Sequence, residues 1–256
     1  MRISKLFSIF EDQTAENIAN SLEGKTLIIF ILKATGVDPS QDYVQITNIA
    51  AIAVDPDGNE IDAFNEEAAL GLAVLHRIDH EDRLLRADEW PQGEMGVRDW
   101  LNAADYDLAA EEEHLVDKPE ELDVVMHFKE FLDQYTNSIL ITYNSKLAMS
   151  HLDAKSPVPI SRFGIIDVPE FAKSYFEPVL RSMMTKGNRQ AAEMADKMWD
   201  NMKKEIDPTL HNLSRAFGIS KAKHSGTIVG EVRQLSSVFS KMLKFVRRNV
   251  GASKPS

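Results

Sequence analysis

Residues 26–36 have the sequence TLIIFILKATG, a run of apolar and β-branched residues that ends in a lysine and a Thr-Gly pair. A continuous apolar run without polar alternation is typical of a strand that is buried on both faces of a sheet. Residues 26–32 are therefore expected to form an interior strand, with the polar residues directly after it.

The segments that follow this strand predict a sheet with helices. Residues 46–54 (ITNIAAIAV) form a second apolar run, and the turn sequence Asp-Pro-Asp-Gly at 55–58 indicates a hairpin that returns through residues 60–64. Further strands are predicted at 139–143 and 163–168. Helices are predicted at 66–87, 97–115, 118–132, 169–184, 187–205 and 208–217, directly after Asn144, and after Gly230. This order predicts an α/β fold in which helices cover both faces of a mixed sheet.

The composition is that of an ordinary globular chain, since 43% of its 256 residues are hydrophobic and 27% are charged. The length fits one large domain with helical insertions. No run approaches the roughly 18–20 apolar residues that a membrane span requires, so no membrane association is expected. The chain has no cysteine, which excludes disulfides and cysteine nucleophiles and makes a cytoplasmic location the expectation.

Domain boundaries can be predicted from the same patterns. Residues 1–24 are expected to form an N-terminal helical extension and not a signal peptide, because their apolar patch is followed at once by Glu11 and Asp12. Residues 25–248 are expected to form the main domain, with helical insertions at about 66–117 and 185–206. Residues 249–256 are expected to form a tail.

The charge is unevenly distributed along the chain. The net charge of −11 argues against a general nucleic-acid coat, because such binding depends on Lys and Arg neutralising phosphates. No acidic residue follows Glu231, however, and that segment contains Lys241, Lys244, Arg247, Arg248 and Lys254. These cations either stabilise the end of a helix or contact phosphates, and the sequence leaves both roles open.

Three segments resemble, in chain order, the three motifs of the DEDD-type (DEDDh-like) 3′–5′ exonuclease family, whose members have a ribonuclease-H-like fold. Residues 30–39 (FILKATGVDP) resemble a strand that ends in Phe-Asp-x-Glu-x-Thr-Gly. Residues 140–148 (LITYNSKLA) resemble a strand followed by His-Asn-x-x-Phe-Asp. Residues 210–235 contain Phe-Gly-Ile, a histidine and the start of a last helix, in the order of the third motif. Phage and bacterial members are the most similar in spacing, which implies a bacterial or phage-infected host.

The resemblance implies a site in which four carboxylates hold two Mg²⁺ or Mn²⁺ ions and a histidine acts as general base. Most of these groups are missing. Ile31 and Lys33 stand at the Asp and Glu positions of the first motif, and Ala148 stands at the Asp position of the second. The third motif keeps its histidine as His224, and its carboxylate is best matched by Glu231.

The catalytic remnants are thus His224 and Glu231. Keeping the family's spacing from His224 would instead select Val229 and leave no carboxylate, but the helix pattern continues correctly from Glu231. The ammonium of Lys33 would repel a metal ion, so no cofactor is expected. We hypothesise that Lys33 pairs with Glu231 in place of the lost metal, while Ile31 fills the emptied space.

The expected function is that of a degenerate, catalytically inactive exonuclease-fold protein that binds single-stranded nucleic acid or a protein partner. One alternative is an active, divergent 3′–5′ exonuclease whose Mg²⁺ or Mn²⁺ ions use other carboxylates. Another is a structural or assembly protein of a phage. The choice between DNA and RNA and the oligomeric state stay open.

Five residues are the candidates for nucleic-acid contacts. In the family, the region of Thr35, Gly36 and Asn144 meets the 3′-terminal nucleotide, although these residues also have a plain role in ending strands. Arg247 and Arg248 belong to the basic C-terminal segment. Other acids have structural interpretations. Turn positions are expected for Asp38 and Asp42, an exposed position for Asp153, and a helix start for Asp167. The methionines at 183, 184, 194, 198 and 202 are either packing residues or an adaptable partner surface.

Overall fold

The computed structural model describes residues 21–87, 89, 91, 95–104, 106–109, 117–157, 160, 163–198, 210–219 and 227–249. The elements, in chain order, are β1 (Thr26–Ala34), β2 (Ile46–Val54), β3 (Glu60–Glu67), α2 (Leu72–Arg86), α3 (Val97–Ala103), α5 (Glu121–Asp133), β4 (Ser138–Thr142), α6 (Ser145–Lys155), β5 (Gly164–Asp167), α7 (Val168–Phe171), η3 (Ala172–Phe176), α8 (Glu177–Thr185), α9 (Arg189–Met198), α10 (Leu210–Ala216) and α11 (Ile228–Asn249). Nearly all of the expected N-terminal extension and of the expected tail lies outside the described residues, as does His224.

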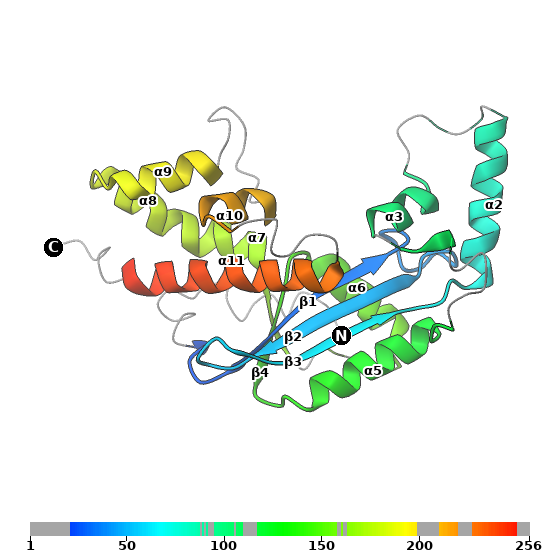
Figure 1. Ribbon diagram of the computed structural model, residues 1–256, viewed down its shortest axis with the longest axis horizontal. Helices are drawn as coiled ribbons and strands as arrows, with labels where there is room; N and C mark the ends of the chain where they lie inside the picture. The colour runs from blue at the N-terminus through cyan, green and yellow to red at the C-terminus, as the bar shows by residue number, and fades with distance from the viewer. Residues whose placement is uncertain are drawn as a thin grey trace.

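The described strands form one mixed sheet in the order β3-β2-β1-β4-β5 (Figure 1). β1 lies in the middle, antiparallel to β2 and parallel to β4. β3 and β5 are the two edges, and β5 has only four residues. The mixed α/β sheet predicted from the sequence is confirmed, and its central strand runs two residues beyond the predicted end, to Ala34.

Helices cover both faces of this sheet, as predicted. Side chains alternate across a strand, so Ile28, Phe30 and Leu32 of β1 pack in one core with α5 and α6. Ile29 lies on the other face, in a core with α7, α8, α10 and α11. The rings of Phe30 and Phe128 on the α5 side lie 5.5 Å apart between centroids.

α11 is the long helix that crosses the second face of the sheet (Figure 1). Its apolar stripe includes Val232, Leu235, Val238 and Val246, all fully buried, and each such side chain contributes about 1.5–3 kcal/mol by leaving water. The prediction that this helix starts after Gly230 is wrong. The helix begins at Ile228, so the glycine lies in its first turn.

The helix predicted at 66–87 also starts later than expected. Residues 66–67 finish β3, because they pair with residues 48–49 of β2, and α2 begins only at Leu72. Helix α3 ends at Ala103, well before the predicted end at 115. The carboxylate of Glu81 is almost fully buried and joins the two helices, because it accepts hydrogen bonds from Arg77 Nε and from the backbone N–H of Val97, both at 2.8 Å.

The helix predicted at 169–184 is present, but it contains one π-helical segment, η3, between α7 and α8. Such segments insert one residue into a helix and change the direction of its side chains. Gly187 follows α8 with φ of 76°, a left-handed conformation that favours glycine and lets the chain turn into α9. Among the described helices, none is long and apolar enough to cross a membrane.

Candidate functional site

The candidate site lies where β1 ends beneath the first turn of α11. Side-chain alternation along β1 places Ile31 and Lys33 on the α11 side of the sheet. Ile31 is partly buried and packs against the core on that face, together with Val229 of α11. The expected apolar filling by Ile31 therefore agrees with its surroundings.

An ion pair joins the two elements at this point. Nζ of Lys33 lies 3.0 Å from Oε2 of Glu231, and the two side chains are 21% and 36% exposed. Glu231 stands in the first turn of α11, where the helix dipole favours a negative charge. The pairing of Lys33 with Glu231 predicted from the sequence is confirmed.

The residues at this point do not fit the two-metal site that the resemblance implies. A hard divalent cation needs several oxygen ligands, whereas Ile31 offers none and the ammonium of Lys33 already occupies the carboxylate of Glu231. Within the described parts of the chain, no three His, Asp or Glu side chains come together as a metal-binding group. Ile31, Lys33 and Glu231 therefore lack the oxygen ligands that a two-metal catalytic step requires.

Ala148 belongs to a different environment from the ion pair. Its side chain is 4% exposed and packs in the core on the α5 and α6 side, with Met149 and Leu152 of the same helix. A carboxylate at this position would have to leave water for an apolar core, which is costly without a partner. The structure thus gives Ala148 a packing role.

Thr35 and Gly36 hold the loop that follows β1. The hydroxyl of Thr35 donates to the carbonyl of Tyr43 at 2.7 Å and accepts from the backbone N–H of Gln45 at 2.9 Å, and its side chain is buried. A Cβ on Gly36 would lie 2.8 Å from Cγ2 of Val44, closer than packed atoms approach. Both residues are needed to close this loop, whatever else they contact.

His151 connects this loop to α6, and no motif in the sequence points to it. The ring is fully buried, with Nε2 3.1 Å from the carbonyl oxygen of Gly36 and Nδ1 3.0 Å from that of Leu147. The only sequence signal is its place one helical turn after Ala148, on the buried side of α6. Its function here is to position the loop.

The residues after β4 anchor helices. Oδ1 of Asn144 accepts from the backbone N–H of Leu147 at 3.2 Å and so caps α6. Asp167 has the helix-starting role predicted for it, because its carboxylate accepts from the N–H of Glu170 at 3.1 Å and also from that of Ser145 at 2.8 Å. Asn144 is exposed, so its side chain is accessible to a ligand even though it caps α6.

A hollow of about 180 Å³ adjoins the Thr35–Gly36 loop. Tyr43 and Trp100 line it, together with Arg77, whose guanidinium carbon lies 4.8 Å from the centroid of the Tyr43 ring. Asp38 also lines it, but its carboxylate accepts from the backbone N–H and the hydroxyl of Ser40, which confirms its turn position. These hydrogen bonds hold the pKa of Asp38 below its ordinary value.

The remaining predicted residues do not join this site. Arg247 and Arg248 are exposed at the far end of α11, about 25 Å from Glu231 at 1.5 Å per residue. Asp42 lies in a turn and Asp153 is exposed, as expected. The site therefore consists of the Lys33–Glu231 pair, the loop that begins at Thr35, and the hollow beside that loop.

Comparison with solved structures finds nucleases. A structure of exonuclease I superposes with a TM-score of 0.54 at 14% identity and covers 88% of this chain and 42% of that chain. The E. coli enzyme in complex with a dT13 oligonucleotide gives a TM-score of 0.53 at 13% identity, and the match covers 89% of this chain and 43% of that chain. Cell-death related nuclease 4 (CRN-4) gives a TM-score of 0.48 at 11% identity, and the match covers 86% of this chain and 64% of that chain. No family model matches the sequence, and no curated protein matches it significantly.

These similarities concern the fold. At such identities, exonuclease I supports the ribonuclease-H-like arrangement of sheet and helices, and the predicted fold class is confirmed. The chain spans less than half the length of the exonuclease I chains that it matches.

Proposed function

We propose that this chain is a degenerate exonuclease-fold protein that binds single-stranded nucleic acid without cleaving it. The observation that carries the proposal is the Lys33–Glu231 ion pair, because it puts a cation where the family's chemistry needs anionic ligands for two metal ions. In that chemistry the metal ions generate the attacking hydroxide, so the missing ligands argue against hydrolysis. The fold would therefore be retained for recognition.

The hollow beside the Thr35–Gly36 loop supports a nucleic-acid ligand. Aromatic rings such as those of Tyr43 and Trp100 can stack on unpaired bases, and the guanidinium of Arg77, which also pairs with Glu81, lies against the Tyr43 ring. Exonuclease I, which has a similar fold, is known in complex with oligonucleotides. The net charge of −11 restricts such binding to local contacts, so a weak salt dependence is expected.

The proposal is tested with a fluorescein-labelled dT13 strand and its RNA counterpart. In EDTA, fluorescence anisotropy should detect binding, and log Kd should change with log salt by a slope of about 1.4–2.1, as two or three single-strand phosphate contacts give. Trp100→Ala should weaken binding about 10-fold by removing a stacking surface, while Trp100→Phe should retain most of it. With Mn²⁺, the strand should stay intact.

Each failure has a distinct meaning. Degradation of the strand by rigorously purified protein would refute inactivity and favour the divergent exonuclease. Absence of binding to both strands would refute recognition of nucleic acid and favour a protein partner. The domain boundaries, the cytoplasmic location and the phage or bacterial kinship remain predictions from the sequence.

A further inference from the structure

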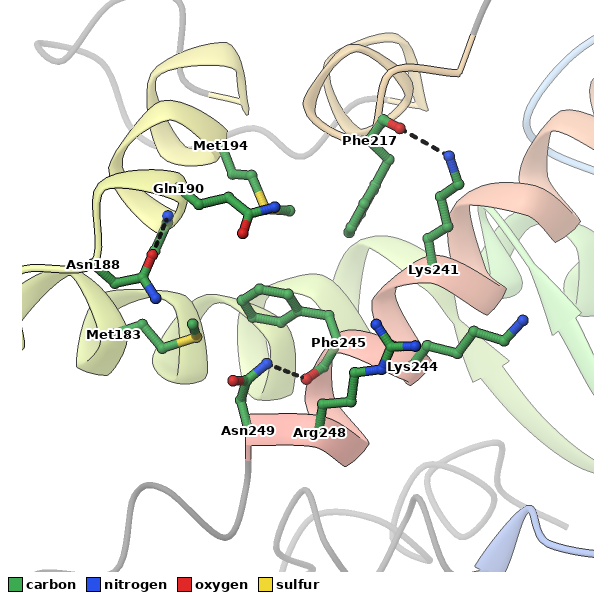
Figure 2. A pocket seen from close by; sticks show the side chains of 11 residues that line it. Met183, Asn188, Gln190, Met194, Phe217, Lys241, Lys244, Phe245, Arg248 and Asn249 are labelled. Carbon is green, nitrogen blue, oxygen red and sulfur yellow. Dashed lines mark hydrogen bonds between the residues drawn. The ribbon is translucent and has the colours of Figure 1, made fainter.

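A second hollow of about 490 Å³ lies between α8, α9, the end of α10 and the last turns of α11 (Figure 2). Its volume is within the range of roughly 300–1,000 Å³ that is usual for small-molecule sites. Its lining residues on α11 begin at Lys241 and include Arg248, about 15 and 25 Å along the helix from Glu231. It is therefore separate from the site described above, and the inference drawn from it does not depend on the proposed function.

Two phenylalanines, Phe217 and Phe245, give this hollow an aromatic surface. Phe217 and Phe245 are only half-buried, and both rings face the hollow in Figure 2. Each packs against Phe176, with centroids 5.3 and 5.1 Å apart, so their orientations are fixed from behind. Met183 and Met194 complete the apolar lining with adaptable side chains. Such a lining suits a flat, unsaturated ring better than a branched aliphatic group.

The charged part of the hollow is entirely cationic. Lys241, Lys244 and Arg248 line it, and none of the described residues that line it is acidic, although the whole chain has 40 acids and a net charge of −11. Lys241 is already engaged, because its Nζ donates to the carbonyl of Phe217 at 2.9 Å. The side chains of Lys244 and Arg248 have no ion pair or hydrogen bond with any described residue. They stand four residues apart on α11, where like charges repel, so an anion between them would relieve an unfavourable contact.

We propose that this hollow binds a nucleoside phosphate. The base stacks on Phe217 and Phe245, the phosphate pairs with Lys244 and Arg248, and the amide of Gln190, which reaches over the hollow in Figure 2, hydrogen-bonds the polar edge of the base. The same chemistry is offered by a free nucleotide and by one nucleotide of a single strand. An acidic peptide would satisfy the cations but would leave the stacking surfaces and the amide without a specific partner.

The test is isothermal titration of the 256-residue chain with dAMP. The charge-reversing variant K244E/R248E should weaken dAMP binding at least 10-fold, as loss of two charge-assisted contacts implies. The control K25E/K173E changes the net charge equally at two lysines outside the hollow and should keep the affinity within about twofold. Phe245→Leu should weaken dAMP but not inorganic phosphate, and a thermal unfolding curve for each variant verifies folding.

The source of the nucleotide is distinguished with a (dA)12 strand. If K244E/R248E weakens (dA)12 as well as dAMP, the hollow takes a nucleotide within a strand; if only dAMP is affected, it takes the free nucleotide. The proposal is overturned if dAMP does not bind the wild-type protein, or if it binds both charge-reversing variants equally. It is also overturned if a ten-residue peptide of alternating Asp and Leu binds in a Lys244- and Arg248-dependent manner while dAMP does not.

Discussion

The coupling free energy of the Lys33–Glu231 pair can be measured by a double-mutant cycle on unfolding with K33M, E231Q and the double variant. The atoms are 3.0 Å apart and the side chains are 21% and 36% exposed, so the pair is neither a surface contact nor a buried one. Exposed pairs couple by about 0.2–1 kcal/mol, and breaking a buried pair costs about 3–5 kcal/mol. An intermediate coupling of about 1–1.5 kcal/mol is expected.

The assay is urea unfolding followed by circular dichroism, with the coupling taken from the four free energies of unfolding. A change of about 1 kcal/mol corresponds to about 2–4 °C in Tm for a chain of this size, so each single variant should melt measurably earlier. The double variant should melt little earlier than either single one. The exposed Arg189–Glu193 pair of α9 is the control, with an expected coupling of about 0.3–0.5 kcal/mol. A coupling at Lys33 below that of the control would refute the idea that this pair replaces a metal in holding α11 to the sheet.

Three further outcomes follow from the same structure. K33E should destabilise the protein by placing two carboxylates together, and Mn²⁺ should restore its Tm but leave the wild-type Tm unchanged; a variant indifferent to Mn²⁺ would contradict this. Gly36→Ala should cost about 1–3 kcal/mol of unfolding free energy through its contact with Val44, and G36A/V44A should recover part of it in the same urea assay. Arg233 holds the pKa of Glu60 below its ordinary value of 4.5, so this contribution to stability is present above pH 4.5 and is lost as the pH falls through the lower folded-state pKa. R233Q should therefore show a smaller loss of unfolding free energy on acidification than the wild type.

The sheet could be predicted because its evidence is local. The apolar run of β1 predicts a strand without reference to its neighbours, and the turn residues between β2 and β3 predict the hairpin. The start of α2 could not be predicted in this way. Residues 66–67 have the charge and spacing of a helix, but their ladder with residues 48–49 of β2 overrides that preference.

The candidate site likewise contains residues that the sequence predicted and residues that only the fold brings together. Lys33 and Glu231 could be paired in advance because both stand at motif positions that the resemblance brings together. The role of His151 could not be predicted, because it depends on a contact with the carbonyl of Gly36, which is 115 residues away in the chain. The second hollow needed the structure as well, because its aromatic and cationic residues come from helices that only the fold brings together.

The position of α11 in the chain has a consequence for synthesis. This helix follows every described strand, yet it supplies much of the cover for one apolar face of the sheet. While the ribosome is still making the last turns of α11, the finished strands present that face to solvent, and exposed surfaces of this kind favour aggregation. Chains that terminate before Ile228 would keep the face uncovered, and they should depend on chaperones or be degraded.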